Sequence, residues 1–390
     1  METWREHMPK GMMLKSYGFA SNLYDPEGAF TLQDFCAERG IAYHHTEIPV
    51  RLDTFANYGV AFRERLALNL EENTVISVAR LPEGFLLRLD SGEELCARSV
   101  VLAVGIAHFQ YVPEIFAQLG PEYVSHTYQH HDLQPFRERN VVVVGGGASA
   151  IELTGLLSEA GAQPRLVSRR MHLHFHNPPS IGKARPLWQR IRNPISGLGV
   201  GWQSLFFANW PSVFRYLPES MRLDLVRTAL GPSAGWTSKK QVVGHVPLLL
   251  GLTPERADIV DGKVRLTLRG ADGSRSEISA DHVITGTGYK VDIEKLQFLS
   301  AEIRRDITVV ESTPVLSNAF ESSVPGLYFV GLAAANTFGP VLRFAFGAGF
   351  AARRVHEALL RSASRTTAPA PVAAVGAASS AQTEGTTTRR

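Results

Sequence analysis

The chain has 390 residues, 44% of them hydrophobic and 20% charged, and a formal net charge of +3 at pH 7. This length is enough for two or three domains, each with its own core. The small net charge, with arginines dispersed along the chain, argues against a nucleic-acid-binding protein. Cys36 and Cys96 are the only cysteines and stand in unrelated contexts, which favours a reducing compartment and argues against dithiol redox chemistry.

Neither end of the chain predicts a membrane or export segment. The start, METWREHMPKG, has no apolar core of a signal peptide, and no stretch is apolar for long enough to span a bilayer. We therefore expect a cytoplasmic protein with no membrane contact. The residues from 362 to 390 are rich in Ala, Ser, Thr and Pro and are predicted to form a disordered tail.

The first thirty residues contain a polar segment punctuated by glycine, MPKGMMLKSYGFASN. Lys15 and Ser16 stand in it, and the composition is typical of a surface that faces a ligand or another domain. An ordinary connecting loop is the alternative. Two helices are expected next, a capped one over Thr31–Gly40 and another over Phe55–Leu66.

From Thr74 the pattern changes to strands. Alternating apolar residues separated by the turns Pro82-Glu83-Gly84 and Asp90-Ser91-Gly92 predict a β-meander, which closes on a buried strand that ends at Gly105.

Residues 139–170 carry the most specific pattern in the chain. The four valines at 141–144 predict a strand buried on both faces, as in a parallel sheet between helices. Gly145, Gly147 and Ala150 follow in the dinucleotide-binding pattern G-x-G-x-x-G/A. Its first glycine allows a tight turn, its second lets the backbone approach a pyrophosphate, and its small third residue lets the helix pack on the strand. The N–H groups at the start of the helix then face the phosphates.

A second strand is expected over Arg165–Ser168, and two arginines follow it. At this point an NAD site usually carries an acidic residue for the ribose 2′-hydroxyl, whereas this chain has Ser168, Arg169 and Arg170. Two guanidinium groups favour a 2′-phosphate, so the expected cofactor is NADPH.

Residues 177–246 interrupt this unit and hold four of the five tryptophans. Such an insertion either caps an active site or forms a helical outgrowth with its own small core. Just before it, His172, His174 and His176 alternate in MHLHFH. The spacing suits a metal, but the position directly after the two arginines favours a role at the adenine or a phosphate, and we expect no metal site. His126, His130 and His131 are expected in a hinge or, alternatively, at an interface.

The meander and its buried strand recur at 263–288, which predicts two nucleotide-binding units of related design. The fold class is therefore α/β, with two Rossmann-like units, each with a meander. The first unit lacks a glycine turn, which we expect before residue 1. We assign residues 1–136 and 282–361 to an FAD-binding type of domain and 137–281 to an NADPH-binding domain.

The last specific segment is LYFVGLAAANTFGP, a short strand over Leu327–Gly331 with a glycine-rich loop after it, and a helix is predicted from Val341 to Leu360. A helix that starts directly after a parallel strand is suited to a flavin ribityl chain or pyrophosphate.

The motifs LAVG, VVGGGASA, TGTGY and VPGLYFVG, in this order, resemble those of flavin-dependent monooxygenases of the two-dinucleotide-binding type. These include flavin-containing monooxygenases, Baeyer–Villiger enzymes and ornithine N-hydroxylases, and the segments MPKGMMLKSYGFASNLYDP and GPSAGW resemble FAD-dependent urate hydroxylase-like proteins. The acidic residue that often follows the last strand glycine in these enzymes is Leu332 here.

The resemblance implies an oxidoreductase in which NADPH reduces FAD and a flavin C4a-hydroperoxide transfers oxygen from dioxygen to a small organic substrate. Because the first glycine turn is missing, we expect residues 1–390 alone to bind FAD poorly and an upstream extension to restore binding. An NADPH-binding reductase and a non-catalytic interaction module are the alternatives.

Candidate site residues follow from these motifs. Lys15, by likeness to loops near the flavin and nicotinamide, and Arg343, as a fixed cation near the flavin or an acidic substrate, are the candidate catalytic residues; a surface ion pair is the alternative for Arg343. The candidate cofactor-binding residues are Ser16, Gly105, Gly145, Gly147, Ser149, Ala150, Arg169, Arg170, Gly288, Gly331, Asn336 and Gly339.

Overall fold

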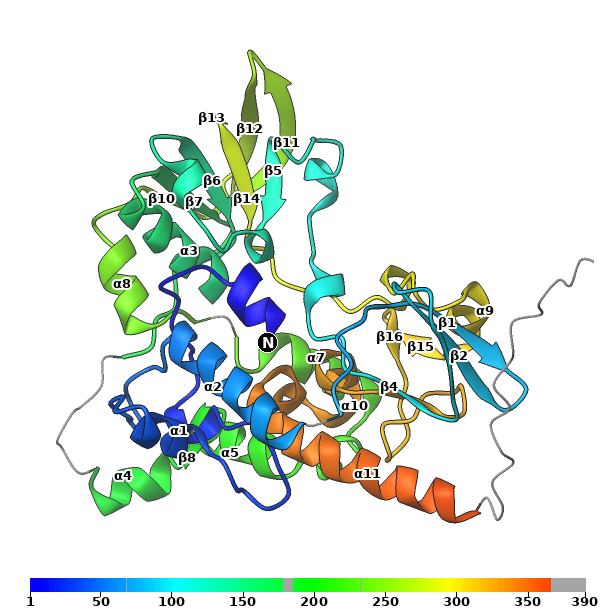
Figure 1. The fold of residues 1–390 in the computed structure, drawn as a ribbon. Helices are drawn as coiled ribbons and strands as arrows, with labels where there is room; N and C mark the ends of the chain where they lie inside the picture. The colour runs from blue at the N-terminus through cyan, green and yellow to red at the C-terminus, as the bar shows by residue number, and fades with distance from the viewer. Residues whose placement is uncertain (68, 178–184, 232, 366–390) are drawn as a thin grey trace, which may run out of the picture.

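The structure, a computed structural model, describes residues 1–67, 69–177, 185–231 and 233–365 (Figure 1). It confirms the α/β class: a five-stranded parallel sheet and a smaller parallel pair each adjoin an antiparallel meander. In the described ranges no helix is both long and apolar enough to cross a membrane.

The five-stranded sheet has the order β10-β7-β6-β14-β5. Its strands are β5 (Val124–His126), β6 (Asn140–Val144), β7 (Gln163–Ser168), β10 (Leu248–Leu250) and β14 (His282–Thr285). Val141 and Val143 pack on the side of helices α3 (Ala148–Glu159) and α8 (Trp236–Val242), whereas Val142 and Val144 pack on the other side against the meander. The unbroken run of valines is therefore explained by burial on both faces.

The meander beside this sheet consists of β11 (Leu252–Val260), β12 (Lys263–Gly270) and β13 (Arg275–Ala280). In β12 the side chains alternate, because Val264, Leu266 and Leu268 are fully buried against the sheet and the residues between them point away. The five-stranded sheet itself reaches beyond residues 137–281 on both sides, since β14 pairs with both β6 and β5. The division of the chain into domains stays a prediction.

The other part of the molecule repeats the design on a smaller scale. Its meander contains β1 (Val75–Leu81), β2 (Gly84–Leu89) and β3 (Glu94–Ala97), and its parallel pair contains β4 (Val100–Leu102) and β17 (Leu327–Phe329). Two short antiparallel strands, β15 (Val309–Val310) and β16 (Thr313–Pro314), lie nearby in the chain. Figure 1 shows this part to the right of the larger sheet, with the meander at its outer edge.

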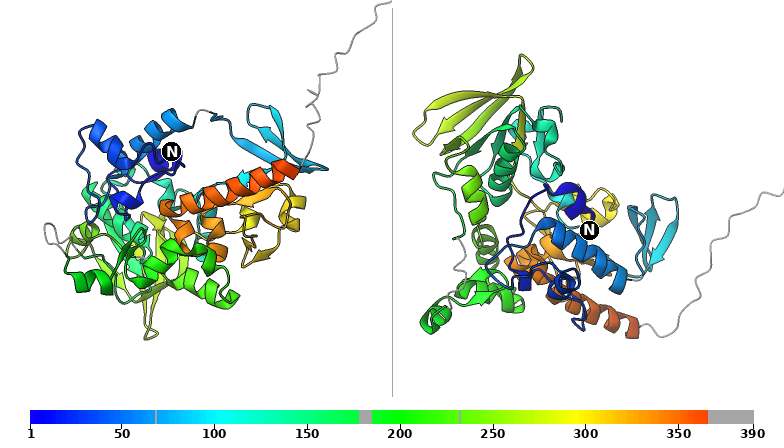
Figure 2. Two further views of the ribbon diagram at one scale, coloured as in Figure 1. Left: turned by 90° about the horizontal axis from the view of Figure 1, so that it is seen from below. Right: turned by 60° about the vertical axis from the view of Figure 1, so that its left-hand side comes forward.

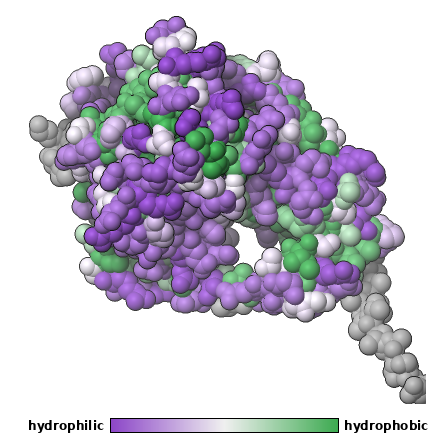
Figure 3. Space-filling view, turned by 90° about the horizontal axis from the view of Figure 1, so that it is seen from above, coloured by the Kyte–Doolittle hydropathy of each residue, from purple (hydrophilic) through white to green (hydrophobic). Residues whose placement is uncertain are grey.

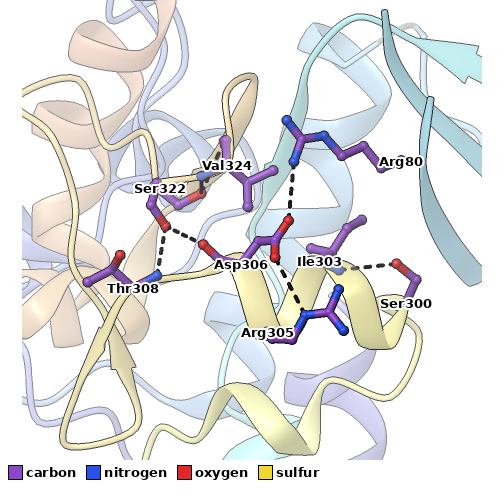
Figure 4. A network of polar contacts seen from close by, with 9 residues as sticks. Arg80, Ser300, Ile303, Arg305, Asp306, Thr308, Ser322 and Val324 are labelled. Atoms are coloured by element: carbon purple, nitrogen blue, oxygen red, sulfur yellow. Dashed lines mark hydrogen bonds and ion pairs between the residues drawn. The ribbon is translucent and has the colours of Figure 1, made fainter. Parts of the chain in front are cut away.

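A polar network ties the β1–β3 meander to helix α9 (Ala301–Asp306) (Figure 4). Arg80 of β1 forms an ion pair of 3.4 Å with Asp306, whose carbonyl accepts a hydrogen bond from Ser323. The Val78 backbone adds two hydrogen bonds, one from its N–H to Phe298 and one to its carbonyl from Ser300. Since exposed ion pairs contribute little, the backbone bonds and the buried Val78 side chain fix this attachment.

Helices cover the remaining faces. The N-terminal pair, α1 (Leu32–Glu38) and α2 (Leu52–Leu66), packs around the buried Tyr58. The Trp-rich insertion has a small core of its own, in which Phe207 and Phe214 are buried. Its elements are α4 (Leu187–Arg192), β8 (Ile195–Ser196), β9 (Gly199–Val200), α5 (Trp202–Asn209), α6 (Pro211–Phe214), α7 (Glu219–Thr228) and α8.

Three predicted boundaries differ from the structure. Helix α2 begins at Leu52 because Arg51 is extended, three residues before the predicted start. In place of the first turns of the helix predicted over 341–360, the structure has two 3-10 turns separated by the extended Phe344, and α11 (Ala348–Arg365) follows them. A short helix, α10 (Ala335–Phe338), ends just before Gly339 and Pro340. Residues 362–365 of the predicted tail still belong to α11, and the remainder of that prediction lies outside the described residues.

Three small residues set the distance between the glycine turn and the sheet. Gly145 has a φ of +152°, and a Cβ added to it would lie 2.3 Å from the Gly286 carbonyl oxygen. A Cβ on Gly286 would lie 2.5 Å from the Cβ of the fully buried Ala150. Helix α3 therefore packs against the end of β14, and the third small residue of the motif serves this contact.

We predict that Gly286→Ala destabilises the protein by about 1–3 kcal/mol, because the added methyl group has no space beside Ala150. The midpoint of urea unfolding measures the loss. Gly231→Ala is the matched control, since a Cβ there would make only an ordinary contact of 3.6 Å with the Thr228 carbonyl. Equal midpoints for Gly286→Ala and the wild type would contradict the packing described.

Candidate functional site

The start of helix α3 exposes unpaired backbone N–H groups next to the glycine turn. The Gly145 N–H is held by the Val167 carbonyl, and Gly147 is the extended residue before the first turn, where Ser149 is exposed. The N–H groups of this turn have no partner within the helix and carry the positive end of its dipole. Gly146 also matters, because a Cβ there would lie 2.5 Å from Ser168 Oγ and 3.4 Å from Arg170 Cδ. The glycine turn thus lies directly beside the end of β7.

The two arginines after β7 have free guanidinium groups. Arg169 is exposed and Arg170 half-buried, and neither forms an ion pair or a side-chain hydrogen bond with another described residue. Their backbone is fixed, since the Arg170 N–H donates to Ser168 Oγ at 3.2 Å and the Arg170 carbonyl accepts from Gly251. A fixed backbone that carries two unpaired guanidinium groups is suited to binding a phosphate group.

The second group of predicted residues gathers at the ends of β4 and β17. These strands are parallel, so Gly105 and Gly331, which follow them, lie at the same edge. Both glycines have a positive φ, and a Cβ on either would meet nothing within 4 Å. Asn336 lies in α10, and Gly339 directly follows this helix. The Asn336 carbonyl accepts a hydrogen bond from Arg222, and Gly339 packs on the Phe214 ring.

The N-terminal segment crosses helix α3. Its Met13 N–H donates to Glu152 Oε1 at 2.8 Å, and Gly11 lies against Leu156. Burial raises the pKa of Glu152 to about 7, although the hydrogen bond from Met13 and the nearby Lys15 oppose this shift. Glu152, a carboxyl group with a pKa near neutral pH, thus lies just after the last residue of the glycine motif, Ala150.

Lys15 lies within electrostatic reach of Glu152 and Arg343. The residue is exposed, yet the surrounding protein desolvates the ammonium group and lowers its pKa, an effect that Glu152 opposes and Arg343 reinforces. His176 shares this environment, because burial and the charge of Lys15 lower its pKa. Ser16 of the same segment is half-buried, and its side chain forms no hydrogen bond with another described residue.

The hydrogen bonds of the Arg343 side chain all go to the insertion. Its guanidinium group donates to the carbonyls of Val226, Ala229 and Leu230, at 3.0–3.3 Å. These carbonyls belong to the C-terminal end of α7, where a cation is favourable. Burial lowers the pKa of Arg343. A catalytic role for Arg343 stays a prediction, and its hydrogen bonds go to the backbone of α7.

The histidines around β5 form a neutral network. Ser125 Oγ lies 2.6 Å from His130 Nε2 and 2.7 Å from His282 Nε2, and His282 Nδ1 lies 3.0 Å from the Glu122 carbonyl. Burial lowers the pKa of His130 to about 4 and also lowers that of His282. The carbonyl requires His282 to donate from Nδ1, so Ser125 donates to His282 and accepts from His130.

His126 has a comparable role beside the predicted Gly288. It donates from Nε2 to the Gly288 carbonyl at 3.1 Å, and burial lowers its pKa to about 4. Among the described residues no group of three or more His, Cys, Asp or Glu side chains is placed to hold a metal ion.

Three residues of this site, Gly146, Glu152 and Gly286, were not predicted from the sequence. Gly286 and Gly146 are close-packing positions that no motif letter marks. Glu152 had a signal, because it is the one charged residue in the first two turns of an otherwise apolar helix. His176 was noted as one of three alternating histidines, but its proximity to Lys15 depends on a contact between distant segments.

The residues present suit NADPH. The glycine turn precedes the unpaired N–H groups of helix α3, and two free guanidinium groups stand beside it at the end of β7. For FAD the fit is partial: the open glycines after β4 and β17 suit its approach, but the described residues hold no second turn of the Gly145–Gly147 kind. Viewed from above, the surface is hollowed by an opening between its left-hand and right-hand parts (Figure 3).

Comparisons with known proteins agree with this geometry. Residues 30–193 match the family model described as pyridine nucleotide-disulphide oxidoreductase. An indole-3-pyruvate monooxygenase, YUCCA1, of Oryza sativa subsp. japonica is 27% identical over 222 residues, which are 53% of this chain and 50% of that protein. A ferredoxin–NADP reductase of Bradyrhizobium sp. is 37% identical over 252 residues, which are 64% of this chain and 56% of the reductase. The chain thus spans about half the length of these two relatives.

A solved structure shows the same fold over nearly the whole chain. The ornithine N-hydroxylase of Kutzneria sp. 744, with reduced FAD, NADP⁺ and L-ornithine, superposes with a TM-score of 0.67 and 16% identity, over 93% of this chain and 90% of the hydroxylase. The resemblance to flavin-dependent monooxygenases of the two-dinucleotide-binding type is therefore confirmed for the fold. Both cysteines of this chain are free, one in α1 and one in β3, so they offer no disulfide of the kind in the family's description.

We predict that Glu152 makes the stability of the fold depend on pH. The pKa of this carboxyl group is higher in the folded state, about 7, than the ordinary 4.5, so the fold loses stability as the pH rises between these values. Below 4.5 the loss is absent, and above about 7 it is complete. The shift corresponds to at most about 3 kcal/mol, and partial exposure reduces the expected effect to about 1–2 kcal/mol.

Glu152→Gln keeps the acceptor for Met13 and removes the ionisation. The free energy of unfolding, measured at pH 4.5, 6 and 8, should favour the variant increasingly as the pH rises. Glu159→Gln, on the exposed side of the same helix, is the control. A difference between Glu152→Gln and the wild type that does not change with pH would sink this assignment.

Proposed function

We propose that this chain, which has the fold of the two-dinucleotide-binding flavoproteins, is an NADPH-dependent flavoprotein monooxygenase that oxygenates a small organic substrate with dioxygen. The observation that carries the proposal is the glycine turn at α3 with two free guanidinium groups beside it, at the end of β7. The named activities of the similar rice monooxygenase and Kutzneria hydroxylase support the oxygenation step.

In this proposal the protein binds NADPH through four kinds of group. The N–H groups around Gly145, Gly147, Ser149 and Ala150 receive the pyrophosphate. Arg169 and Arg170 receive the 2′-phosphate. Gly288, whose carbonyl His126 holds, lines the same edge of the sheet. Lys15 and Ser16 approach from the N-terminal segment, where the desolvated ammonium group of Lys15 provides a positive charge near Glu152.

FAD, when bound, supplies the oxygen chemistry. Gly105, Gly331, Asn336 and Gly339 are the residues we propose to lie against it, because the glycines have open space and follow parallel strands. Arg343 fixes the end of α7 near this group and so positions the insertion. No acid–base pair is assigned, since the protein's tasks are to orient the two cofactors and to exclude water from their contact.

A reductase is the second candidate, favoured by the identity of 37% to a ferredoxin–NADP reductase. The two activities differ in their products. A monooxygenase gives an oxygenated organic product in proportion to NADPH consumed, whereas a reductase passes the electrons to a separate acceptor. We further propose a cytoplasmic location, which the unpaired cysteines favour.

The direct experiment supplies the purified chain with excess FAD, NADPH, air and a panel of amines, ketones, sulfides and aromatic acids. We expect substrate-dependent NADPH oxidation and an oxygenated product that carries ¹⁸O from ¹⁸O₂. NADPH oxidation that only an added ferredoxin or artificial acceptor stimulates would replace the proposal with the reductase. Flavin absorbance per mole of protein tests the expected weak FAD binding, which stays a prediction.

We predict that replacing both Arg169 and Arg170 with alanine weakens NADPH binding and leaves NADH binding nearly unchanged. Each lost charge-assisted hydrogen bond to the phosphate costs about 1.5–3 kcal/mol, so NADPH should bind at least roughly tenfold more weakly. Titration calorimetry with both nucleotides measures the effect. The control is the double variant of Arg190 and Arg192 to alanine, which removes the same charge from exposed residues of α4. Equal losses for NADPH and NADH would show that Arg169 and Arg170 do not read the 2′-phosphate.

A further inference from the structure

A cavity lies apart from the glycine turn. It has a volume of about 420 Å³ and is lined by residues of the N-terminal segment 19–24, the α5–α6 junction and the start of α11. Figure 2 shows that these elements, dark blue, green and orange, come together on the side of the molecule away from the β11–β13 meander. The volume is in the range of small-molecule sites.

Four aromatic residues contribute to the walls of this cavity, beside the neutral polar side chains of Asn22, Asn209 and Ser212. Phe19, Tyr24, Phe346 and Phe350 line it. Phe19 stacks on His45 at 5.0 Å, and Phe350 packs on Phe320 and Phe338, at 5.6 Å each. Ring positions held in this way form a preorganised apolar wall, which suits a flat ligand.

Two glycines leave the space that two of these rings occupy. A Cβ on Gly197 would lie 2.4 Å from the Phe346 ring, and a Cβ on Gly349 would lie 2.8 Å from the Tyr24 ring. Gly349 belongs to helix α11, whose backbone does not need glycine there. Its absent side chain therefore leaves room for Tyr24 at the wall.

Among the described residues, Arg353 is the one ionised side chain that lines the cavity. It is exposed, its guanidinium group lies 5.7 Å from the centre of the Tyr24 ring, and it forms no ion pair with another described residue. The neighbouring Arg354, in contrast, donates to Ser212 Oγ at 3.1 Å. No acidic side chain from the described part of the chain lines the cavity. A ligand in this cavity thus meets aromatic rings, a few neutral polar groups and one uncompensated positive charge.

The cavity shares two chain segments with the candidate site. The N-terminal segment supplies Lys15 to the site and Phe19 to the cavity, and the segment after β17 supplies Arg343 to the site and Phe346 to the cavity. We propose that this cavity binds a small, flat aromatic carboxylic acid, with the carboxylate toward Arg353. That this acid is the substrate rests on the proposed function; its binding does not.

Binding is tested by titration calorimetry of the full chain with phenylacetate, without NADPH or FAD. Phenylacetamide is the neutral probe of the same shape, and phenethylamine is the cationic one. We expect phenylacetate to bind at least about fivefold more tightly than either probe at low salt, with the advantage shrinking at 1 M salt because the arginine is exposed. Equal affinities for the three probes, or no binding of any, would overturn the proposal.

Three variants localise the site. Arg353→Gln should weaken phenylacetate about fivefold and leave phenylacetamide within about twofold, whereas Arg361→Gln, exposed on the same helix, should change neither. Gly349→Ala favours the helix but pushes Tyr24 into the cavity, so both ligands should weaken at least about tenfold. If Arg361→Gln weakens phenylacetate as much as Arg353→Gln, the effect is one of net charge and the carboxylate contact is wrong.

The outcomes separate the two proposals. Tight phenylacetate binding that depends on Arg353, without oxygenation of any aromatic acid in the assay, would keep the cavity as a binding site and remove only its role in the proposed reaction. Oxygenation of another substrate without phenylacetate binding would keep the proposed function and overturn this inference.

Discussion

The close approach of Gly145, Ala150 and Gly286 is the constraint on which the candidate site depends. Each would-be Cβ at the two glycines comes within 3.0 Å of an atom across the contact. Because protein interiors are packed at crystal density, no neighbour can absorb an added methyl group there. The contact fixes where helix α3 starts relative to β6 and β14, and therefore where its free N–H groups point. Gly146 extends the same constraint to the end of β7.

Electrostatics adds a second layer to this packing. Glu152 and Lys15 lie near each other, yet desolvation moves the pKa of each toward its neutral form, and their attraction opposes both shifts. Ionisable groups whose pKa values are shifted by burial and by a charged neighbour are concentrated at functional sites. The histidines beside it are different, because Ser125 and two backbone carbonyls satisfy them in neutral form.

The sequence was informative where a pattern is local. The four valines, the glycine turn and the capped helix after Thr31 were predictable, because each depends on neighbours within a few residues. The helix predicted over 341–360 was wrong in its first turns, since Gly339 and Pro340 favour 3-10 turns whose close contact with Val341 needs Gly347. Partners such as Gly286 for Ala150, Glu152 for Met13 or α7 for Arg343 lie more than a hundred residues apart, and periodicity carries no signal for them.

The place of β14 in the larger sheet bears on how the chain folds during synthesis. β14 lies between β6 and β5, yet His282 follows Ser125 by 157 residues. At about 5–20 residues per second, β5 waits roughly 10–30 s for its only partner in the sheet. During that interval the edge of β6 that later pairs with β14 has unpaired backbone groups. Pairing between strands so far apart in the sequence is slow. A ribosome-bound chain of this design is therefore exposed to strand exchange with its neighbours until its last third has emerged.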